Sequence, residues 1–485
     1  MAALAATHGP VPHHGGFHLD PPLYYPPTQQ PGGASDSSMP MPCFPFFRSP
    51  PTLVSPHPEG LDAIRLVEAG KPIPRSKTDE SVDAAHPPLS QQFHVLGFTT
   101  EAKFIAHGLA GIPKIPPIQI FVHNPVPMSR WGTEGRNIRL LDAEGRYMSA
   151  HDIQCPELIG PFTPGLKLRQ YGTKMKFLDN IVVSTASWCI VSSLRHLQNR
   201  IDRRTTICLL HKGLGLMEWL NTRVFTDPAL RPRYVLGHLT HKVSKHSDNS
   251  YTLRTKNDGK LYLYCVPEHE PNSDGQVQWS REAMRQTQNL VKLMSATQYL
   301  GTVGIGWENF IFRKLPAVVF SSLADSISVI LGCRYDQILN DHHAMRLWHS
   351  LLEETVRIIH SFPELQDHKE IREYFAGASF RKHLWSRLIA RKDGYSPWIT
   401  WIRSGHNSGV HFTNGYFINR AIETGVDHSH NSMVINMVLA RQKARRRELE
   451  NDIPYGLSPY LMDGDKLGGG QGDSDPDLDD IENSI

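Results

Sequence analysis

Paired cysteines and long apolar runs are what this sequence most clearly lacks. The six cysteines lie far apart and none belongs to a Cys-x-x-Cys pair, which argues against a disulfide framework and against the usual zinc motifs. No stretch approaches the roughly 18 uninterrupted apolar residues of a membrane-spanning helix. We therefore expect no bound metal, no membrane span and a reducing compartment.

A strong charge of either sign is also missing. The 485 residues carry 51 Lys and Arg against 48 Asp and Glu, a net charge of +3, which gives no argument for nucleic acid or lipid as a partner. The first basic residue is Arg48, so the amino-terminal segment lacks the charged region of a secretory signal. Its low acid content is shared with mitochondrial presequences, and both the cytoplasm and the mitochondrion stay open as the location.

Prolines and acids are concentrated near the two ends instead. Residues 1–90 carry half of the 36 prolines, and proline removes backbone donors and favours extended neighbours, so we predict a disordered extension there. Residues 463–485 hold eight acids and one lysine. This composition predicts that residues 451–485 form a disordered acidic tail.

The central part of the chain divides into two halves of different pattern. In residues 91–275, five short β-type runs alternate with helical stretches, which predicts an α/β domain with a parallel sheet. Within it, residues 251–266 predict a β-hairpin around an Asn-Asp-Gly sequence. In residues 276–450 the apolar spacing is helical, which predicts an all-α domain. Gly304-x-Gly306 is expected to follow a helix there, whereas a dinucleotide turn requires a strand.

Four segments together resemble the ketopantoate reductase (2-dehydropantoate 2-reductase) family, and most of all its fungal members. They read AHGLAGIPKIPPIQIFVH, TTICLLHKGLGLMEWLNTRVFTDPALRPRYVLG, SLADSISVILGCRYDQIL and TNGYFINRAIETGV. The resemblance covers about residues 93–445. It implies a Rossmann-like amino-terminal domain and an all-α carboxyl-terminal domain, with NADPH and substrate bound between them.

The phosphate-binding turn that the resemblance implies is degenerate in this chain. Residues 97–102 read GFTTEA, where a working turn has the pattern G-x-G-x-x-G/A. Gly97 and Ala102 meet the first and third requirements, but Thr99 places a branched side chain where the pyrophosphate should approach. Glu101 adds a carboxylate that competes with phosphate for the helix N-terminus. No bound cofactor is therefore expected, and NADPH is expected only if the protein is active.

Other cofactor positions that the resemblance implies are also altered. Asn124 stands where an Arg should pair with the 2′-phosphate, and Ala186 stands where a Lys is implied. Lys212-Gly213 replaces an Asn-Gly pair, and a lysine cannot supply both the donor and the acceptor of an amide. Arg130 is an alternative phosphate contact, and Lys212 is interpreted as a loop lysine or a remodelled anion contact.

The catalytic lysine of the family has no direct counterpart. Counted without gaps from SVILGC, it falls on Ala317, and two asparagines of its helix fall on Ser321 and Asp325. Lys314 lies three residues earlier, about 4.5 Å along a helix axis. It is interpreted as a lysine at the helix start, with general-acid catalysis as the alternative.

The substrate-binding Glu of the family falls on Gly409, with Asn407 and His411 as polar neighbours. The combined losses predict a ketopantoate-reductase-like protein that has lost NADPH-dependent reduction and has a binding or regulatory role. One alternative is an active reductase of 2-dehydropantoate or another 2-oxo acid, with Lys314 as the acid. Another is a mitochondrial accessory factor for gene expression.

Partner and metal sites are weakly indicated. Residues 440–450, ARQKARRRELE, are interpreted as a solvated basic helix end, with contact to an acidic protein or RNA as the alternative. No aromatic residues interleave with the basic run, which weakens an RNA-stacking interpretation. The pairs His342-His343 and His428-x-His430 have no third ligand placed by the sequence, so structural roles are expected. A homodimer is left open.

Overall fold

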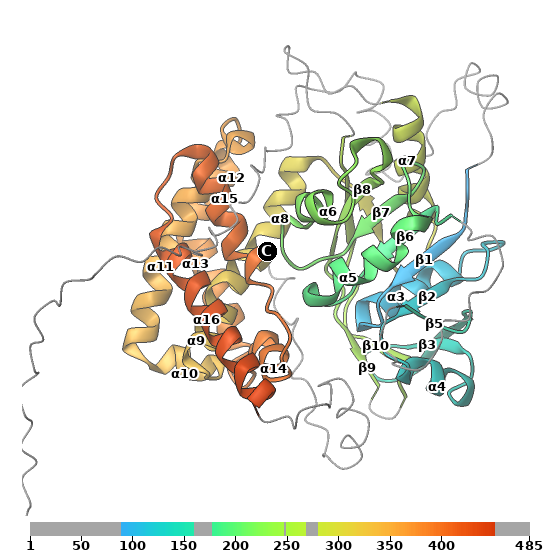
Figure 1. Cartoon of the computed structure of the whole chain (residues 1–485), viewed down its shortest axis with the longest axis horizontal. Helices are drawn as coiled ribbons and strands as arrows, with labels where there is room; N and C mark the ends of the chain where they lie inside the picture. The colour runs from blue at the N-terminus through green and yellow to red at the C-terminus, as the bar shows by residue number, and fades with distance from the viewer. Residues whose placement is uncertain (1–88, 160–176, 247–248, 268–279, 452–485) are drawn as a thin grey trace, which may run out of the picture. The chain divides into compact units, whose positions relative to one another are not determined.

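The computed structural model describes residues 89–159, 177–246, 249–267 and 280–451, all of them within one compact unit, Phe44–Ile485. The extension predicted for residues 1–90 and the acidic tail predicted for residues 451–485 lie almost wholly outside the described residues. Figure 1 shows the arrangement of the helices and strands.

An eight-stranded sheet organises the first half of the described chain. Its order is β12-β11-β8-β7-β6-β1-β2-β5, and the six strands from β8 to β5 run parallel, while β11 is antiparallel to β8. The strands are β1 (Phe93–Leu96), β2 (Gln119–Val122), β5 (Glu157–Leu158), β6 (Asn180–Val183), β7 (Thr206–Leu209), β8 (Arg233–Leu239), β11 (Leu261–Cys265) and β12 (Thr302–Gly304). The strand order reverses between β1 and β6, which is where doubly wound folds bind their ligands.

Helices cover both faces of this sheet, as the buried runs of its strands require. The helices α3 (Thr100–Ala110) and α7 (Arg281–Ser295) share one apolar cluster with Val95. The helices α5 (Ser187–Leu197) and α6 (Leu216–Arg223) share another with Leu96, the next residue of the same strand. The predicted Rossmann-like α/β domain is therefore confirmed.

A second, four-stranded sheet was not predicted. Its order is β4-β3-β10-β9, and the helix α4 (Val126–Thr133) leads into it. The strands are β3 (Asn137–Leu141), β4 (Tyr147–Asp152), β9 (Val243–Lys245) and β10 (Thr252–Thr255).

The second sheet shows that the predicted hairpin is wrong, because β10 and β11 belong to different sheets. The Asn257 side chain accepts a hydrogen bond from the Lys242 amide at 2.6 Å and donates one to the Thr240 carbonyl at 3.3 Å. A side chain at Gly259 would collide with the backbone of His241. The Asn-Asp-Gly sequence is thus tied to the segment after β8 and does not form a two-strand turn.

The second half of the described chain is helical, as predicted, and shares one core. Its helices are α8 (Trp307–Phe320), α9 (Ser326–Leu331), α10 (Tyr335–Asn340), α11 (His342–His360), α12 (Lys369–Ala376), α13 (Ala378–Ile389), α14 (Pro397–Arg403), α15 (Asn414–Thr424) and α16 (Ser429–Asn451). A π-helical segment, Ser321–Asp325, joins α8 to α9. The domain boundary at residue 276 stays a prediction, and Leu290 and Met294 of α7 pack in the sheet core.

One expectation for the start of this half is wrong, and one apolar helix there was not expected. Gly304 ends strand β12 and α8 begins at Trp307, so the Gly304-x-Gly306 pair follows a strand and not a helix. The helical stretch Trp307–Leu331 is long and apolar enough to meet a length-and-composition test for a membrane span. Its most apolar window is 72% buried, which is typical of a central core helix.

Candidate functional site

The degenerate turn is occupied by the chain's own side chains. Gly97 has a φ of +119°, and a side chain there would collide with the Ser184 carbonyl. Thr99 is the N-cap of α3, and its hydroxyl accepts a hydrogen bond from the Ala102 amide at 3.0 Å. The same hydroxyl lies 3.1 Å from Ser184 Oγ on the neighbouring strand. The N-terminus of α3 is therefore capped from within the chain.

Polar residues of α3 and of the segment after β2 are also engaged in contacts within the chain. Asn124 Oδ1 accepts a hydrogen bond from the Val126 amide, at the start of α4. Arg130, the alternative phosphate contact, donates to Ser250 Oγ at 2.8 Å. Lys103, which the sequence analysis missed, is 4% exposed and donates to the Ser250 carbonyl at 2.6 Å. Burial is the main cause that lowers the pKa of Lys103 to about 8.

Two aromatic rings meet over the switch point between β1 and β6. The indole of Trp188, in the first turn of α5, stacks on the imidazole of His406 with ring centres 3.8 Å apart and planes 3° apart. His123, which follows β2, meets the edge of Trp188 at 5.5 Å. Burial and the nearby His406 lower the pKa of His123. This contact joins the sheet edge to the loop after α14.

The loop after β7 packs against the segment before α15. A side chain at Gly213 would collide with the Phe412 carbonyl, and the Leu214 amide donates to that carbonyl at 2.9 Å. Lys212 is exposed, whereas Gly213 is buried. The two members of the predicted pair therefore face different surroundings, and only Gly213 contributes to this contact.

A serine–histidine pair in the same region has the wrong tautomer for nucleophilic catalysis. His211 Nδ1 accepts a hydrogen bond from the Gly213 amide at 3.1 Å, so a neutral imidazole carries its proton on Nε2. That nitrogen lies 2.9 Å from Ser187 Oγ and donates to it. A base that is to activate a serine must instead accept the hydroxyl proton. Burial, followed by Lys314, lowers the pKa of His211 to about 3.

Lys314 does not lie at the start of a helix, as interpreted, because α8 begins at Trp307. Its side chain is 4% exposed, and its amine donates to the His211 carbonyl. Ser321 Oγ and the Tyr335 hydroxyl both donate to the Asp325 carboxylate. Ser321 and Asp325 lie at the two ends of the π-helical segment, and the hydrogen bond from Tyr335 ties that segment to α10.

The remaining predicted positions lie near the same contacts. Gly409 is buried, and a side chain there would approach Trp398 Nε1 to 3.2 Å. His411 packs against Trp219, and burial lowers its pKa to about 4. Asn407 is exposed and accepts hydrogen bonds from side chains of α16.

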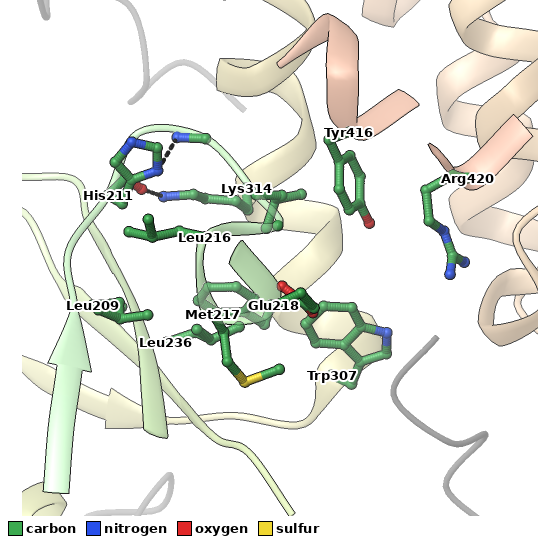
Figure 2. Close-up of a pocket in the computed structure, with 15 residues that line it drawn as sticks. Leu209, His211, Leu216, Met217, Glu218, Leu236, Trp307, Lys314, Tyr416 and Arg420 are labelled. Carbon is green, nitrogen blue, oxygen red and sulfur yellow. Dashed lines mark hydrogen bonds between the residues drawn. The ribbon is translucent and has the colours of Figure 1, made fainter. Parts of the chain in front are cut away.

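Figure 2 shows a small pocket beside His211 and Lys314. Its volume is about 40 Å³, and it lies between the start of α6, α8 and α15. Arg420 lines it and pairs with the buried Glu364 at 2.5 Å and with Glu423 at 2.9 Å. Glu218 also lines it, and burial raises the pKa of this carboxyl to about 7. A pocket of this size holds about three water-sized groups and is too small for a nicotinamide ring.

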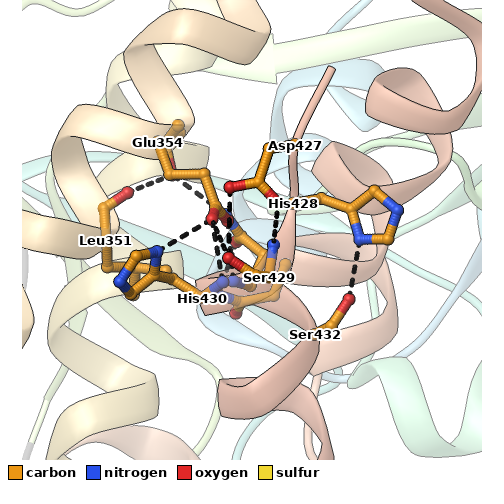
Figure 3. Close-up of polar contacts among 10 residues, drawn as sticks. Leu351, Glu354, Asp427, His428, Ser429, His430 and Ser432 are labelled. Atoms are coloured by element: carbon orange, nitrogen blue, oxygen red, sulfur yellow. Dashed lines mark hydrogen bonds and ion pairs between the residues drawn. The ribbon is translucent and has the colours of Figure 1, made fainter. Parts of the chain in front are cut away.

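The histidines near the start of α16 have structural roles (Figure 3). The Glu354 carboxylate of α11 is fully buried and accepts hydrogen bonds from the backbone amides of His430 and Asn431, both at 2.8 Å. His430 Nδ1 lies 2.9 Å from the same carboxylate, and His428 Nδ1 pairs with Ser432. Among the residues that the structure describes, no three His, Cys, Asp or Glu side chains could hold a metal ion.

The basic run lies on the last turns of α16 and contacts the loop after α14. Arg445 donates to the Arg403 carbonyl at 3.2 Å, and Arg446 donates to Asn407 Oδ1 at 2.8 Å. Lys443 and Arg447 are exposed. Two of the basic side chains thus have structural contacts, and the expected acidic partner stays a prediction.

Comparison with known proteins places this arrangement in a class. The family model described as "Ketopantoate reductase PanE/ApbA C terminal" matches residues 309–442. A 2-dehydropantoate 2-reductase of Saccharomyces cerevisiae is 22% identical over 264 residues, which is 51% of this chain and 62% of the relative. The match thus spans less than two thirds of that relative's length.

Solved structures share the fold across most of the described chain. A 2-dehydropantoate 2-reductase from Geobacter metallireducens has a TM-score of 0.50 at 10% identity, covering 72% of this chain and 99% of its own. A D-mandelate dehydrogenase solved with NADH and anilino(oxo)acetate has a TM-score of 0.50 at 12% identity, covering 73% and 99%. The chain therefore shares the fold of these two solved proteins. Together with the match of its C-terminal domain, this makes the chain similar to the ketopantoate reductases.

The buried Glu354 should hold the start of α16 in place. Replacing it (Glu354→Ala) leaves the buried amide of Asn431 and the partly buried amide of His430 without an acceptor, so we expect the free energy of unfolding to fall by about 3 kcal/mol. The control is Glu353→Ala, since Glu353 is the exposed neighbour on the same helix. Urea denaturation of both variants measures the difference, and equal stabilities would refute the capping role.

Acid should destabilise the protein through His211. The pKa of His211 is about 3 in the folded chain, against an ordinary value of 6.5. Between these two pH values the imidazole is protonated in the unfolded chain but stays neutral in the folded chain. The stabilising contribution is therefore complete above pH 6.5 and is lost as the pH falls toward 3. We expect the free energy of unfolding of His211→Gln to fall less steeply, by up to about 1.4 kcal/mol per pH unit. The variant His349→Gln, at an exposed position, should follow the wild type, and identical slopes for all three proteins would contradict this role.

Proposed function

We propose that this ketopantoate-reductase-like protein has lost NADPH-dependent reduction and acts by binding. The observation that carries the proposal is the state of the switch-point edge, where Rossmann-like domains hold a dinucleotide. Thr99 caps the helix that should receive the pyrophosphate, and Trp188 stacks on His406 above the strand ends.

Three contributions to the binding free energy of NADPH together favour loss of the cofactor site. Displacing the Thr99 cap costs about 1 kcal/mol, and breaking the stack of Trp188 on His406 costs about 1 kcal/mol more. The missing charge-assisted contact to the 2′-phosphate, with Asn124 in place of Arg, removes about 1.5–3 kcal/mol. The sum of about 4 kcal/mol corresponds to roughly a thousandfold weaker binding.

An active reductase with a rewired site is the second candidate, and one observation favours it. Lys314 is buried and lines the pocket beside His211, so its amine does not point to solvent. In this candidate the Lys314 ammonium would protonate the alkoxide that forms when hydride reaches a ketone. The small volume of the pocket counts against it.

The full-length protein should give no thermal shift with NADPH and no oxidation of NADPH with 2-dehydropantoate. A ligand at about 100 times its Kd would stabilise the folded chain by about 2.7 kcal/mol, which differential scanning fluorimetry detects readily. The Saccharomyces cerevisiae reductase provides the positive control in both assays. A clear shift would refute the loss of cofactor binding. Reduction that disappears in Lys314→Met would establish the second candidate.

A further inference from the structure

The pocket of Figure 2 is lined by a tyrosine hydroxyl for which the described part of the chain supplies no hydrogen-bond partner. This is the hydroxyl of Tyr416, a residue that is only 7% exposed. Glu218, which is half-buried, lines the same space, and among the described residues its carboxylate accepts a hydrogen bond from its own backbone amide and interacts with the charge of Arg420. Buried polar groups are almost always satisfied by protein, water or ligand.

The start of α6 gives the pocket a positive character. Its N-cap is Gly215, with a φ of +83° and no side-chain cap, unlike α3 with Thr99. The amides of Leu216 and Met217, which line the pocket, have no acceptor in the described ranges. Uncapped first-turn amides carry the partial positive charge of the helix dipole.

The two cationic side chains of the pocket wall, Lys314 and Arg420, differ in how much positive charge they add. Lys314 brings a positive charge to the pocket wall next to the His211 carbonyl. Arg420 is balanced by its two buried or half-buried carboxylates, Glu364 and Glu423. The rest of the wall is apolar and is formed by Leu209, Leu216, Leu236, Trp307 and Phe310.

We propose that this pocket binds a short-chain monocarboxylate, with its carboxylate against the start of α6 and the Tyr416 hydroxyl and its alkyl group on the apolar wall. The inference rests on the proposed function, because it assigns a ligand to a protein that acts by binding. The volume of about 40 Å³ suits a molecule of about the size of acetate, since one water occupies roughly 10–15 Å³ by the same measure. A phosphate would place charged oxygens against the leucines, which disfavours it.

Glu218 links this binding to pH. Burial holds its pKa at about 7, so the carboxyl is mostly protonated and neutral at lower pH and ionised at higher pH. An ionised Glu218 would repel a second carboxylate in the same small space. The carboxylate ligand therefore binds when Glu218 is protonated, and the affinity for the ligand falls as the pH rises through 7.

Calorimetric titration of the full-length protein with sodium acetate, at constant ionic strength set with chloride, tests the site. We expect binding to be about tenfold weaker at about pH 8 than at about pH 6, with close to one proton taken up per acetate at the higher pH. No heat of binding at either pH, or an affinity that does not change between them, would overturn the proposal.

Matched variants separate the site from non-specific anion effects. Tyr416→Phe keeps the ring and removes the hydroxyl, and we expect at least a roughly fivefold loss of affinity for acetate. Glu218→Gln keeps the size and removes the ionisation, so acetate should still bind but without the dependence on pH. Tyr395→Phe, at a tyrosine that is 45% exposed and outside the pocket, is the control and should bind like the wild type. Wild-type affinity in Tyr416→Phe would refute the assignment.

The two proposals fail in different ways. Binding of NADPH would refute the proposed function, independently of whether acetate binds. If the protein binds neither NADPH nor acetate, only the proposal of a monocarboxylate in this pocket is refuted. A titration with sodium chloride in place of sodium acetate compares the affinities for the two anions. Equal affinities would show that the apolar wall of the pocket has no role in recognition and would refute the monocarboxylate assignment.

Discussion

The stacking of Trp188 on His406 is the contact on which this account of the protein depends. It joins α5 of the sheet domain to the loop after α14, directly over the strand ends where a dinucleotide would cross. The neighbouring contact of Gly213 with Phe412 closes the next strand end in the same way. These two contacts together form an interface between the two halves of the chain.

Protonation of the histidines beside this interface lowers the stability of the folded chain. His211 is buried and His411 is half-buried beside it, and desolvation lowers their pKa values to about 3 and about 4. Neutral imidazoles pack well there, but charged ones do not, so the burial of these rings makes the contact between the two halves sensitive to acid. Lys314 adds to this effect, since it approaches His211 from α8.

The sequence predicted the parts of the fold that depend on neighbouring residues. The fully buried runs of β1, β6 and β7 could be inferred because each pattern is local. The second sheet could not, since β3 pairs with β10 from more than a hundred residues away. The contact of Trp188 with His406 was missed for the same reason. The position of Lys314 was misjudged because Pro316, which suggests a helix start, lies in the interior of α8.

The most direct test is a crystal structure of the full-length protein grown with excess NADPH. The account predicts no nucleotide at the turn after β1, with the Thr99 hydroxyl still bonded to the Ala102 amide and Trp188 still stacked on His406. A pyrophosphate lying against the backbone of Gly97 and Thr99, with the indole of Trp188 displaced, would contradict it.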